Sequence, residues 1–285
     1  MSYILHTIQE LLPTLQGKDK DLAAYILAHP KPLTQMSITE VARQSGASPA
    51  TITRFCKSLH FAGFPDLKVK LSSDLASRSV SNSYQDLVEG NTLPAIIQAI
   101  EANHIRSIMD TTQLIEPEQW ELVIERLLEA RRIDLYGVAT SGLVAQDFYQ
   151  KLVRIGKPAA AFTDTHMQIT SASSLTEEDV AFVISYSGET PEMIDALRCA
   201  KDNGAYTISL TKYGSSPLSQ LADIALFTSS LESGMRRGDM ASRIAQLHVI
   251  DILFTGLTTK KFDAYVPRLE HAYQMVQRYR KDKGR

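Results

Sequence analysis

The sequence predicts a fold of two parts: an all-helical N-terminal domain, then an α/β domain whose open parallel sheet has helices on both faces. Three observations lead to this fold class. Apolar residues recur at helical spacing throughout residues 1–76. Short β-rich runs that alternate with helical segments begin only near residue 133. Between them, residues 77–92 form a polar, serine-rich stretch that is typical of a linker.

Helical patterns fill the first domain and the connection to the second. The spacing of apolar residues predicts helices over about 4–12, 22–27, 37–44, 48–60 and 66–77, and two more over about 93–112 and 118–130. Prolines and glycines separate most of these segments, as expected where helices end. The predicted domains are therefore residues 1–77, a linker and connecting helix over 78–117, and residues 118–285.

Five β-rich runs predict the strands of the second domain. They cover about residues 133–138, 159–163, 180–186, 206–210 and 224–227. Because helical segments separate them, the strands are expected to run parallel. A last long helix is expected over about 240–257, followed by a tail rich in lysine and arginine.

Helix signals near residue 45 indicate two helices joined by a short turn. Ser37 and Glu40 have the spacing of a capping box, and Gly46 ends the helix that they open. Ser48 and Pro49 then start the next helix with a favourable N-cap and a proline in the first position. These are the dimensions of a helix-turn-helix, whose second helix enters the major groove of DNA.

This second helix has an apolar face and a polar face. Ile52, Phe55, Cys56 and Leu59 fall on one side and are expected to pack inward. The other side carries small, hydrogen-bonding and cationic side chains, which suit base edges and phosphates. The residues expected to bind DNA are Ser48, Ala50, Thr51, Thr53, Arg54, Lys57 and Lys68. Within this set, Ala50, Thr51 and Arg54 would approach base edges, and Lys57 and Lys68 would meet phosphates. A plain helical bundle exposes similar residues, so the pattern alone leaves both interpretations open.

Positive charge is concentrated in the N-terminal part. Residues 1–80 hold nine Lys or Arg and six Asp or Glu, whereas the whole chain has a net charge of −2. A basic domain in an otherwise acidic chain suits a polyanionic partner such as DNA. Solvated basic helix faces are also common, so the charge is weak evidence by itself.

Two loops of the second domain combine small residues, hydroxyls and the start of a helix. Residues 137–142 read GVATSG after the first strand, and residues 185–190 read SYSGET after the third. Free amides at a helix N-terminus attract anions, and open α/β sheets place ligands at the carboxyl ends of their strands. Helix capping explains either loop alone, but two such loops in one sheet favour a phosphate site.

Several other kinds of site are not expected. The chain has neither a dinucleotide-binding glycine pattern nor a P-loop, so no cofactor is predicted. His166 follows the second strand, but no second histidine or cysteine stands at metal spacing, so no metal is predicted. Cys56 and Cys199 lie far apart, no run is long enough to span a membrane, and the first residues do not resemble a signal peptide. These features predict a cytoplasmic protein.

The segment SITEVARQSGASPATITRFCKSLHFAGFPDLKVKL, residues 37–71, resembles the helix-turn-helix of RpiR-type transcriptional regulators. The two loops resemble those of the sugar isomerase (SIS) domain, over about residues 120–260. The sequence departs from the SIS pattern at Ala139, where glycine is usual, and at Tyr186, where isomerases often carry glutamine. The resemblance implies a DNA-binding regulator that responds to a phosphosugar.

The resemblance also implies which residues bind this effector. The phosphate would be held by hydroxyls and close backbone at Ser141, Gly142, Ser185, Ser187, Gly188 and Thr190. Glu232 lies where SIS isomerases and lyases place a catalytic carboxylate; here it bonds sugar hydroxyls or lies on the surface. Residues 161–166 and 185–190 are most similar to regulators of N-acetylmuramate 6-phosphate use. The resemblance does not exclude another hexose or hexosamine phosphate as the effector.

Three functions are consistent with these features. The first is an effector-controlled regulator that binds operator DNA as a homodimer or homotetramer. The second is an active phosphosugar isomerase or lyase with Glu232 as its base. The third is a ligand-sensing adaptor whose helical domain binds protein. An enzyme does not need a basic recognition helix, and the specific match at residues 48–57 counts against the adaptor. The sequence therefore predicts a regulator, either repressor or activator, and no enzyme.

Overall fold

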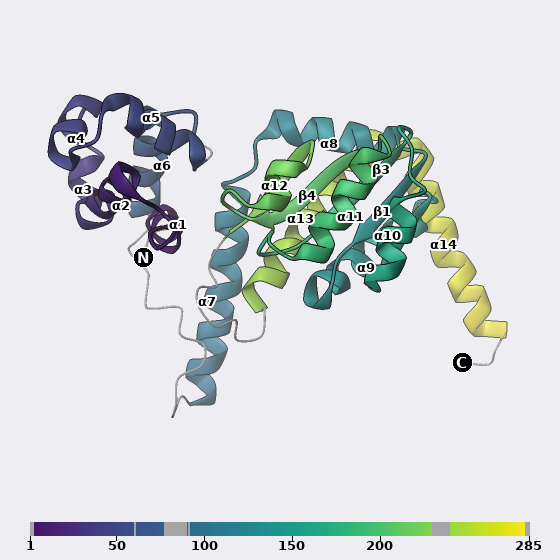
Figure 1. The fold of residues 1–285 in the computed structure, drawn as a ribbon. Helices are drawn as coiled ribbons and strands as arrows, with labels where there is room; N and C mark the ends of the chain where they lie inside the picture. The colour runs from purple at the N-terminus through teal and green to yellow at the C-terminus, as the bar shows by residue number, and fades with distance from the viewer. Residues whose placement is uncertain (1–2, 60, 77–89, 91, 230–239, 283–285) are drawn as a thin grey trace. The chain divides into compact units, whose positions relative to one another are not determined.

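The structure, a computed structural model, describes residues 3–59, 61–76, 90, 92–229 and 240–282. The chain divides into two compact units (Figure 1). The first contains residues 1–110, 213–215 and 229–241, and the second contains residues 111–212, 216–228 and 242–285. Most of the predicted linker, residues 77–89 and 91, lies outside the described residues. No helix in the described part of the chain is long and apolar enough to cross a membrane.

The first unit begins with a cluster of short helices. They are α1 (Tyr3–Leu11), α2 (Gly17–Ala28), α3 (Pro30–Leu33), α4 (Ile38–Ser45), α5 (Pro49–Ser58) and α6 (Phe64–Ala76). Five of these confirm the helices predicted from apolar spacing, and α3 is an additional single turn that opens on Pro30. Ile8, Leu22, Ile52 and Leu67 are buried and come from four different helices, so the cluster has a core of its own. The helix α7 (Leu93–Thr112) follows and confirms the predicted connecting helix.

The second unit contains a five-stranded parallel sheet, as the sequence predicts. Its strands are β1 (Arg132–Tyr136), β2 (Ala159–Phe162), β3 (Asp179–Ile184), β4 (Tyr206–Lys212) and β5 (Ile224–Thr228). Their spatial order is β2-β1-β3-β4-β5, and every neighbouring pair is parallel. The order runs outward in opposite directions from β1 and β3, which makes the gap between these two strands the switch point of the sheet.

Helices cover both faces of the sheet (Figure 1). One face packs against α8 (Pro117–Glu129), α9 (Ala139–Arg154) and α13 (Met240–Lys260), with a core that includes Phe148 and Phe182. The other face packs against α10 (Thr165–Ala172), α11 (Pro191–Asp202) and α12 (Pro217–Leu221), around Tyr136 and Val183. Strand residues alternate between the two cores, as the period of two requires.

The basic tail expected after residue 257 contains a helix that the sequence pattern did not predict. A further helix, α14 (Phe262–Asp282), follows α13 almost immediately. Pro267 lies inside it and resembles a helix-ending signal in the sequence. Tyr265 and Leu269 pack against the core of the sheet, and Arg268 donates to the carbonyl of Ile155 at 3.0 Å. These contacts stabilise the helix around the proline.

Candidate effector and DNA sites

The two predicted phosphate loops lie beside each other in the structure. Residues 137–142, the β1 loop, follow β1, and residues 185–190, the β3 loop, follow β3. β1 and β3 are neighbours in parallel register, with Tyr136 opposite Val183, so both loops leave the same edge of the sheet. This edge is the carboxyl end of the strands at the switch point, where open α/β sheets bind ligands.

The β1 loop is a tight turn into α9. A side chain at Gly137 would have its Cβ 2.8 Å from the carbonyl carbon of Ser141, so only glycine fits. Gly142 is also confined, though less severely, because a Cβ there would be 3.1 Å from the carbonyl oxygen of Gly137. The turn thereby packs the first amides of α9 close to the strand end. The α9 N-terminus carries no acidic residue in its first turn, which leaves its positive dipole end available to an anion.

Ala139 has a backbone φ of +49°, the only positive φ outside glycine in the described residues. This is the position at which the SIS pattern usually has glycine. An alanine there retains the same turn at an energetic cost of about 1–2 kcal/mol, because its Cβ approaches the following carbonyl. The alanine at residue 139 therefore keeps the turn of the SIS pattern with a strained backbone.

Hydroxyl groups of the β3 loop are not used as helix caps. Thr190 occupies the N-cap position of α11, yet its side chain makes no capping hydrogen bond. Its Oγ1 lies instead 3.1 Å from Oγ of Ser185, and Oγ of Ser187 accepts from the Glu189 amide at 3.2 Å. Ser187 and Thr190 are half-buried, whereas Ser185 is buried. The arrangement differs from simple capping, which was the alternative interpretation of this loop.

Gly188 fixes the shape of the β3 loop. Its φ is +67°, and a Cβ would collide with the hydroxyl of Ser216 at the start of α12. Its carbonyl accepts from the Leu218 amide at 3.1 Å, so the loop is fastened to α12 by its backbone. The β3 loop is consequently anchored to α12 at Gly188.

Glu232, the predicted contact of the sugar or catalytic carboxylate, lies outside the described residues. No group of three or more His, Cys, Asp or Glu with metal-binding geometry occurs among the residues that the structure describes.

The helix-turn-helix of the first unit consists of α4, a short turn and α5. Ser37 and Glu40 form the predicted capping box, and Gly46 ends α4 with a φ of +67°. Ser48 caps α5 by accepting from the Thr51 amide at 3.1 Å, with Pro49 in the first helical position. These local signals fix the turn angle, and the buried side chains of α5 are those predicted to face inward.

The burial of Cys56 fits this inward face. Burial raises the pKa of its thiol to about 12, with a further contribution from the carboxylate of Asp66. The thiol is therefore protonated at neutral pH and packs as a small apolar group.

The side chains predicted to contact DNA line the outer face of α5. Ser48, Ala50, Arg54 and Lys57 are exposed, and Thr51 and Thr53 are half-buried. The hydroxyls of both threonines bond locally: Thr51 Oγ1 is 2.9 Å from Ser48 Oγ, and Thr53 Oγ1 donates to the carbonyl of Pro49. Arg54 Nη2 donates to both carboxylate oxygens of Asp19 in α2, at 3.2 and 3.3 Å. The structure thus brings six of the seven predicted residues onto one short segment.

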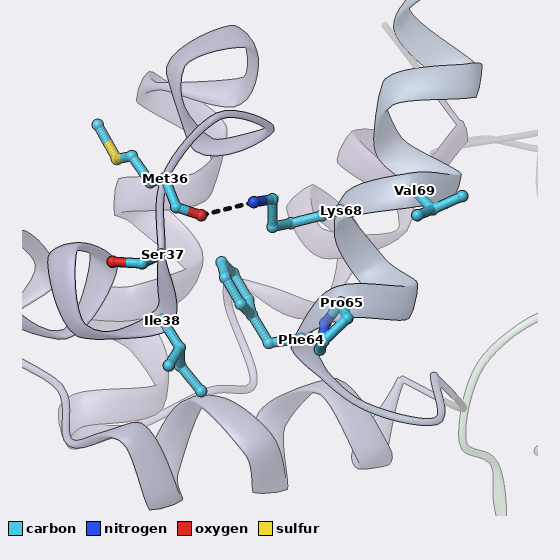
Figure 2. Close-up of a pocket in the computed structure, with 7 residues that line it drawn as sticks. All are labelled: Met36, Ser37, Ile38, Phe64, Pro65, Lys68 and Val69. Atoms are coloured by element: carbon cyan, nitrogen blue, oxygen red, sulfur yellow. Dashed lines mark hydrogen bonds between the residues drawn. The ribbon is translucent and has the colours of Figure 1, made fainter.

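Lys68, the seventh residue, comes from α6 and borders an apolar groove of about 480 Å³ (Figure 2). Its ammonium donates to the carbonyl of Met36 at 2.7 Å and lies 5.8 Å from the ring centre of Phe64. The groove is lined by Met36, Ser37, Ile38, Phe64, Pro65, Lys68 and Val69. Lys68 therefore holds α6 to the segment before α4, in addition to the phosphate contact predicted for it.

Comparison with known proteins identifies both parts of the chain. Residues 2–78 match the helix-turn-helix domain of the rpiR family, and residues 126–256 match the SIS domain. An uncharacterized HTH-type transcriptional regulator of Caldanaerobacter subterraneus is 42% identical over 276 residues, covering 97% of this chain and 98% of the relative. The chain belongs to the RpiR family of transcriptional regulators.

Two further proteins similar to this RpiR-family regulator extend the comparison. The HTH-type regulator HexR of Pseudomonas aeruginosa is 33% identical over 269 residues, covering 94% of each chain. The structure of Vibrio vulnificus NanR complexed with ManNAc-6P has a TM-score of 0.63 and 28% identity, and covers 96% of this chain and 98% of that one.

Two buried glutamines of the RpiR-family regulator hold the β1 loop, and sequence analysis did not select either. Gln168 of α10 donates to the carbonyls of Gly137 and Phe162, at 3.0 and 2.6 Å. Gln246 of α13 donates to Oγ of Ser141 at 3.4 Å and is 2% exposed. A glutamine inside a helical pattern carries no signal in the sequence, because only the fold shows that it faces a loop.

The bond from Gln246 affects how the Ser141 hydroxyl can be used. Since the Ser141 oxygen accepts from the amide, its hydrogen is directed elsewhere and is available to an acceptor. The ionised oxygens of a phosphate accept hydrogen bonds. The pairing therefore suits a hydroxyl that donates to a phosphate.

Proposed function

We propose that this regulator changes its affinity for operator DNA when a phosphosugar binds between the β1 loop and the β3 loop. The observation that carries the proposal is the adjacency of the two loops at the switch point, each leading into a helix N-terminus. A phosphate there would meet amides of α9 and α11 together with hydroxyls of Ser141, Ser187 and Thr190. The ligand can change DNA affinity only to the extent that it binds the two states of the regulator differently.

The proposed effector class is an amino-sugar 6-phosphate. NanR of Vibrio vulnificus, whose structure contains ManNAc-6P, is similar over nearly the whole chain, which supports a ligand of this class. The resemblance of residues 185–190 to regulators of N-acetylmuramate 6-phosphate use supports the same class. The site residues proposed are Ser141, Gly142, Ser185, Ser187, Gly188, Thr190 and Glu232.

In the proposed DNA complex, α5 lies in the major groove. Ala50, Thr51 and Arg54 approach base edges, Lys57 and Lys68 meet phosphates, and Ser48 and Thr53 complete the contact face. A homodimer or homotetramer places two such helices on a palindromic operator. Acting on chromosomal DNA, the protein works in the cytoplasm and has no catalytic role.

A thermal-shift screen of sugar phosphates tests the effector proposal. A ligand at 100 times its Kd stabilises the folded state by about 2.7 kcal/mol, so a tight effector raises the melting temperature visibly. N-acetylmuramate 6-phosphate, ManNAc-6P, glucose 6-phosphate and inorganic phosphate are the informative probes. Ser187→Ala is expected to weaken the shift. Ser173→Ala is the control. Ser173 follows the end of α10, outside the two loops, and its hydroxyl donates to the carbonyl of Thr170. Equal shifts of the melting temperature in the two variants contradict the proposed phosphate site.

The same ligand is then added to a DNA-binding assay, in which a change in operator affinity is expected. Affinity should also fall steeply with salt, because each phosphate contact releases counterions. Turnover of a phosphosugar that is lost in Glu232→Gln would instead favour the enzyme interpretation.

A further inference from the structure

Arg54, the cation of the proposed base-reading face, is bound to an acidic residue of another helix. Its Nη2 lies 3.2 and 3.3 Å from the two carboxylate oxygens of Asp19, which stands in the first turn of α2. The Arg54 side chain remains 72% exposed, whereas Asp19 is 30% exposed. The carboxylate therefore approaches one nitrogen of the guanidinium and leaves most of its surface open.

The remaining nitrogens of Arg54 retain the donors needed to read a base. A guanidinium is planar and has five N–H donors, and a guanine accepts two of them at O6 and N7. Among the described residues, no protein acceptor binds Nε or Nη1 of Arg54. A carboxylate held against Nη2 restricts rotation of the plane, and so directs the open donors.

Stability does not explain why an acidic residue should lie beside a surface that binds phosphates. An ion pair whose cation is exposed to solvent contributes little to the stability of the fold. A negative charge close to DNA also lowers affinity for every sequence alike. Asp19 is favourable at a helix N-terminus, but so is any acidic residue in that turn.

We infer that Asp19 is a positioning residue for sequence recognition: it holds Arg54 in the orientation that reads one base pair. This rests on the proposed function, in which α5 enters the major groove. The expected consequence is that Asp19 reduces the general affinity for DNA while raising the preference for one base pair.

The experiment compares Asp19→Asn with Asp21→Asn in the full-length protein. Both variants remove one negative charge from α2 without a change of shape. Asp21 pairs with Lys18 at 3.4 Å, and no bond from Asp21 to Arg54 occurs within the described residues, so it is a matched control. The operator is first selected from randomised duplexes with the wild-type protein. Dissociation constants are then measured for that operator, for each single base-pair substitution of it, and for an unrelated duplex.

Arg54→Ala is expected to lose discrimination at one base pair by roughly 5- to 150-fold, the effect of about 1–3 kcal/mol. Asp19→Asn is expected to lose about two- to fivefold at that same base pair. Both asparagine variants should bind the unrelated duplex slightly more tightly than the wild type. In an Arg54→Ala background, Asp19→Asn should no longer affect discrimination.

The inference is overturned if Asp19→Asn discriminates as well as Asp21→Asn, or if its loss of discrimination persists without Arg54. Thermal unfolding of both asparagine variants shows whether a difference arises from folding instead, since a folding defect would weaken binding to all duplexes together. If the proposed function itself is wrong and the protein does not recognise an operator, the result is different: the wild-type protein enriches no sequence from the randomised duplexes.

Discussion

Two residues of the β1 and β3 loops show how backbone conformation decides which side chains a position tolerates. Gly188 and Ala139 both have a positive φ, +67° and +49°. At Gly188 a side chain would collide with Ser216, whereas Ala139 holds its Cβ at the cost of strain. A positive φ at Gly188 could be expected from the glycine in the loop sequence. The positive φ at Ala139 could not, because the alanine differs from the SIS pattern only in lacking the usual glycine.

Gly188→Ala is expected to lower the free energy of unfolding by about 2 kcal/mol, from the positive φ and the collision together. Gly204→Ala is the control, because Gly204 also has a positive φ of +90° but its Cβ would find its nearest neighbour at 3.7 Å. Urea unfolding measures both. A loss in Gly188→Ala no larger than in Gly204→Ala would show that the α12 contact does not confine the loop.

Ala139→Gly is expected to stabilise the protein by about 0.5 kcal/mol, since relief of strain exceeds the entropy lost by glycine. Ala145→Gly in the interior of the same helix should destabilise it by about 1 kcal/mol. Differential scanning calorimetry distinguishes the two signs. If both substitutions destabilise, the turn at residue 139 is not strained.

At the scale of helices and strands, the sequence predicted most of what the structure contains. The five strands and the α4–α5 turn have strong local signals: apolar runs, a capping box, Gly46 and Pro49. The helix α14 was missed because Pro267 suggests a break, and its stability comes from contacts with residues distant in sequence. The roles of Gln168 and Gln246 could not be predicted for a related reason, since packing alone brings them to the β1 loop.

Gln246→Met is expected to weaken effector binding by about fivefold, which corresponds to loss of one hydrogen bond of about 1 kcal/mol. Methionine has a similar size, so the packing of α13 should change little. Gln274→Met, at an exposed position of α14, is the control. Isothermal calorimetry with the effector found in the screen measures both affinities; equal values would exclude a role of Gln246 in orienting Ser141.

At the scale of the whole molecule, an ion pair between the exposed Arg131 and the buried Asp179 joins distant segments of the second unit. Asp179, at the start of β3, accepts from Arg131 Nη2 at 2.7 Å and from the amide and hydroxyl of Thr176. Burial raises the pKa of Asp179, but these hydrogen bonds outweigh burial and hold the pKa below its usual value. The ionised form is therefore favoured more in the folded state than in the unfolded state.

The stability contributed by Asp179 is present at neutral pH and is lost as pH falls below about 4 through the lowered folded-state pKa. Asp179→Asn is expected to cost about 2 kcal/mol at pH 7. In this variant the free energy of unfolding should also decrease less steeply as the pH falls. Denaturant titrations from pH 7 to pH 2 measure this; an unchanged acid slope in the variant would contradict the assignment.

The switch point between β1 and β3 has a mechanical consequence. The helices that begin at its two loops leave the sheet toward opposite faces, α9 into one core and α11 into the other. A single bound anion that touches both N-termini therefore connects two layers that the sheet otherwise keeps apart. The same geometry places the partially positive N-termini of α9 and α11 next to each other. Without an anion between them, these two helix ends repel each other. An occupied site relieves that repulsion, so the loops are expected to be held closer together with an effector than without one.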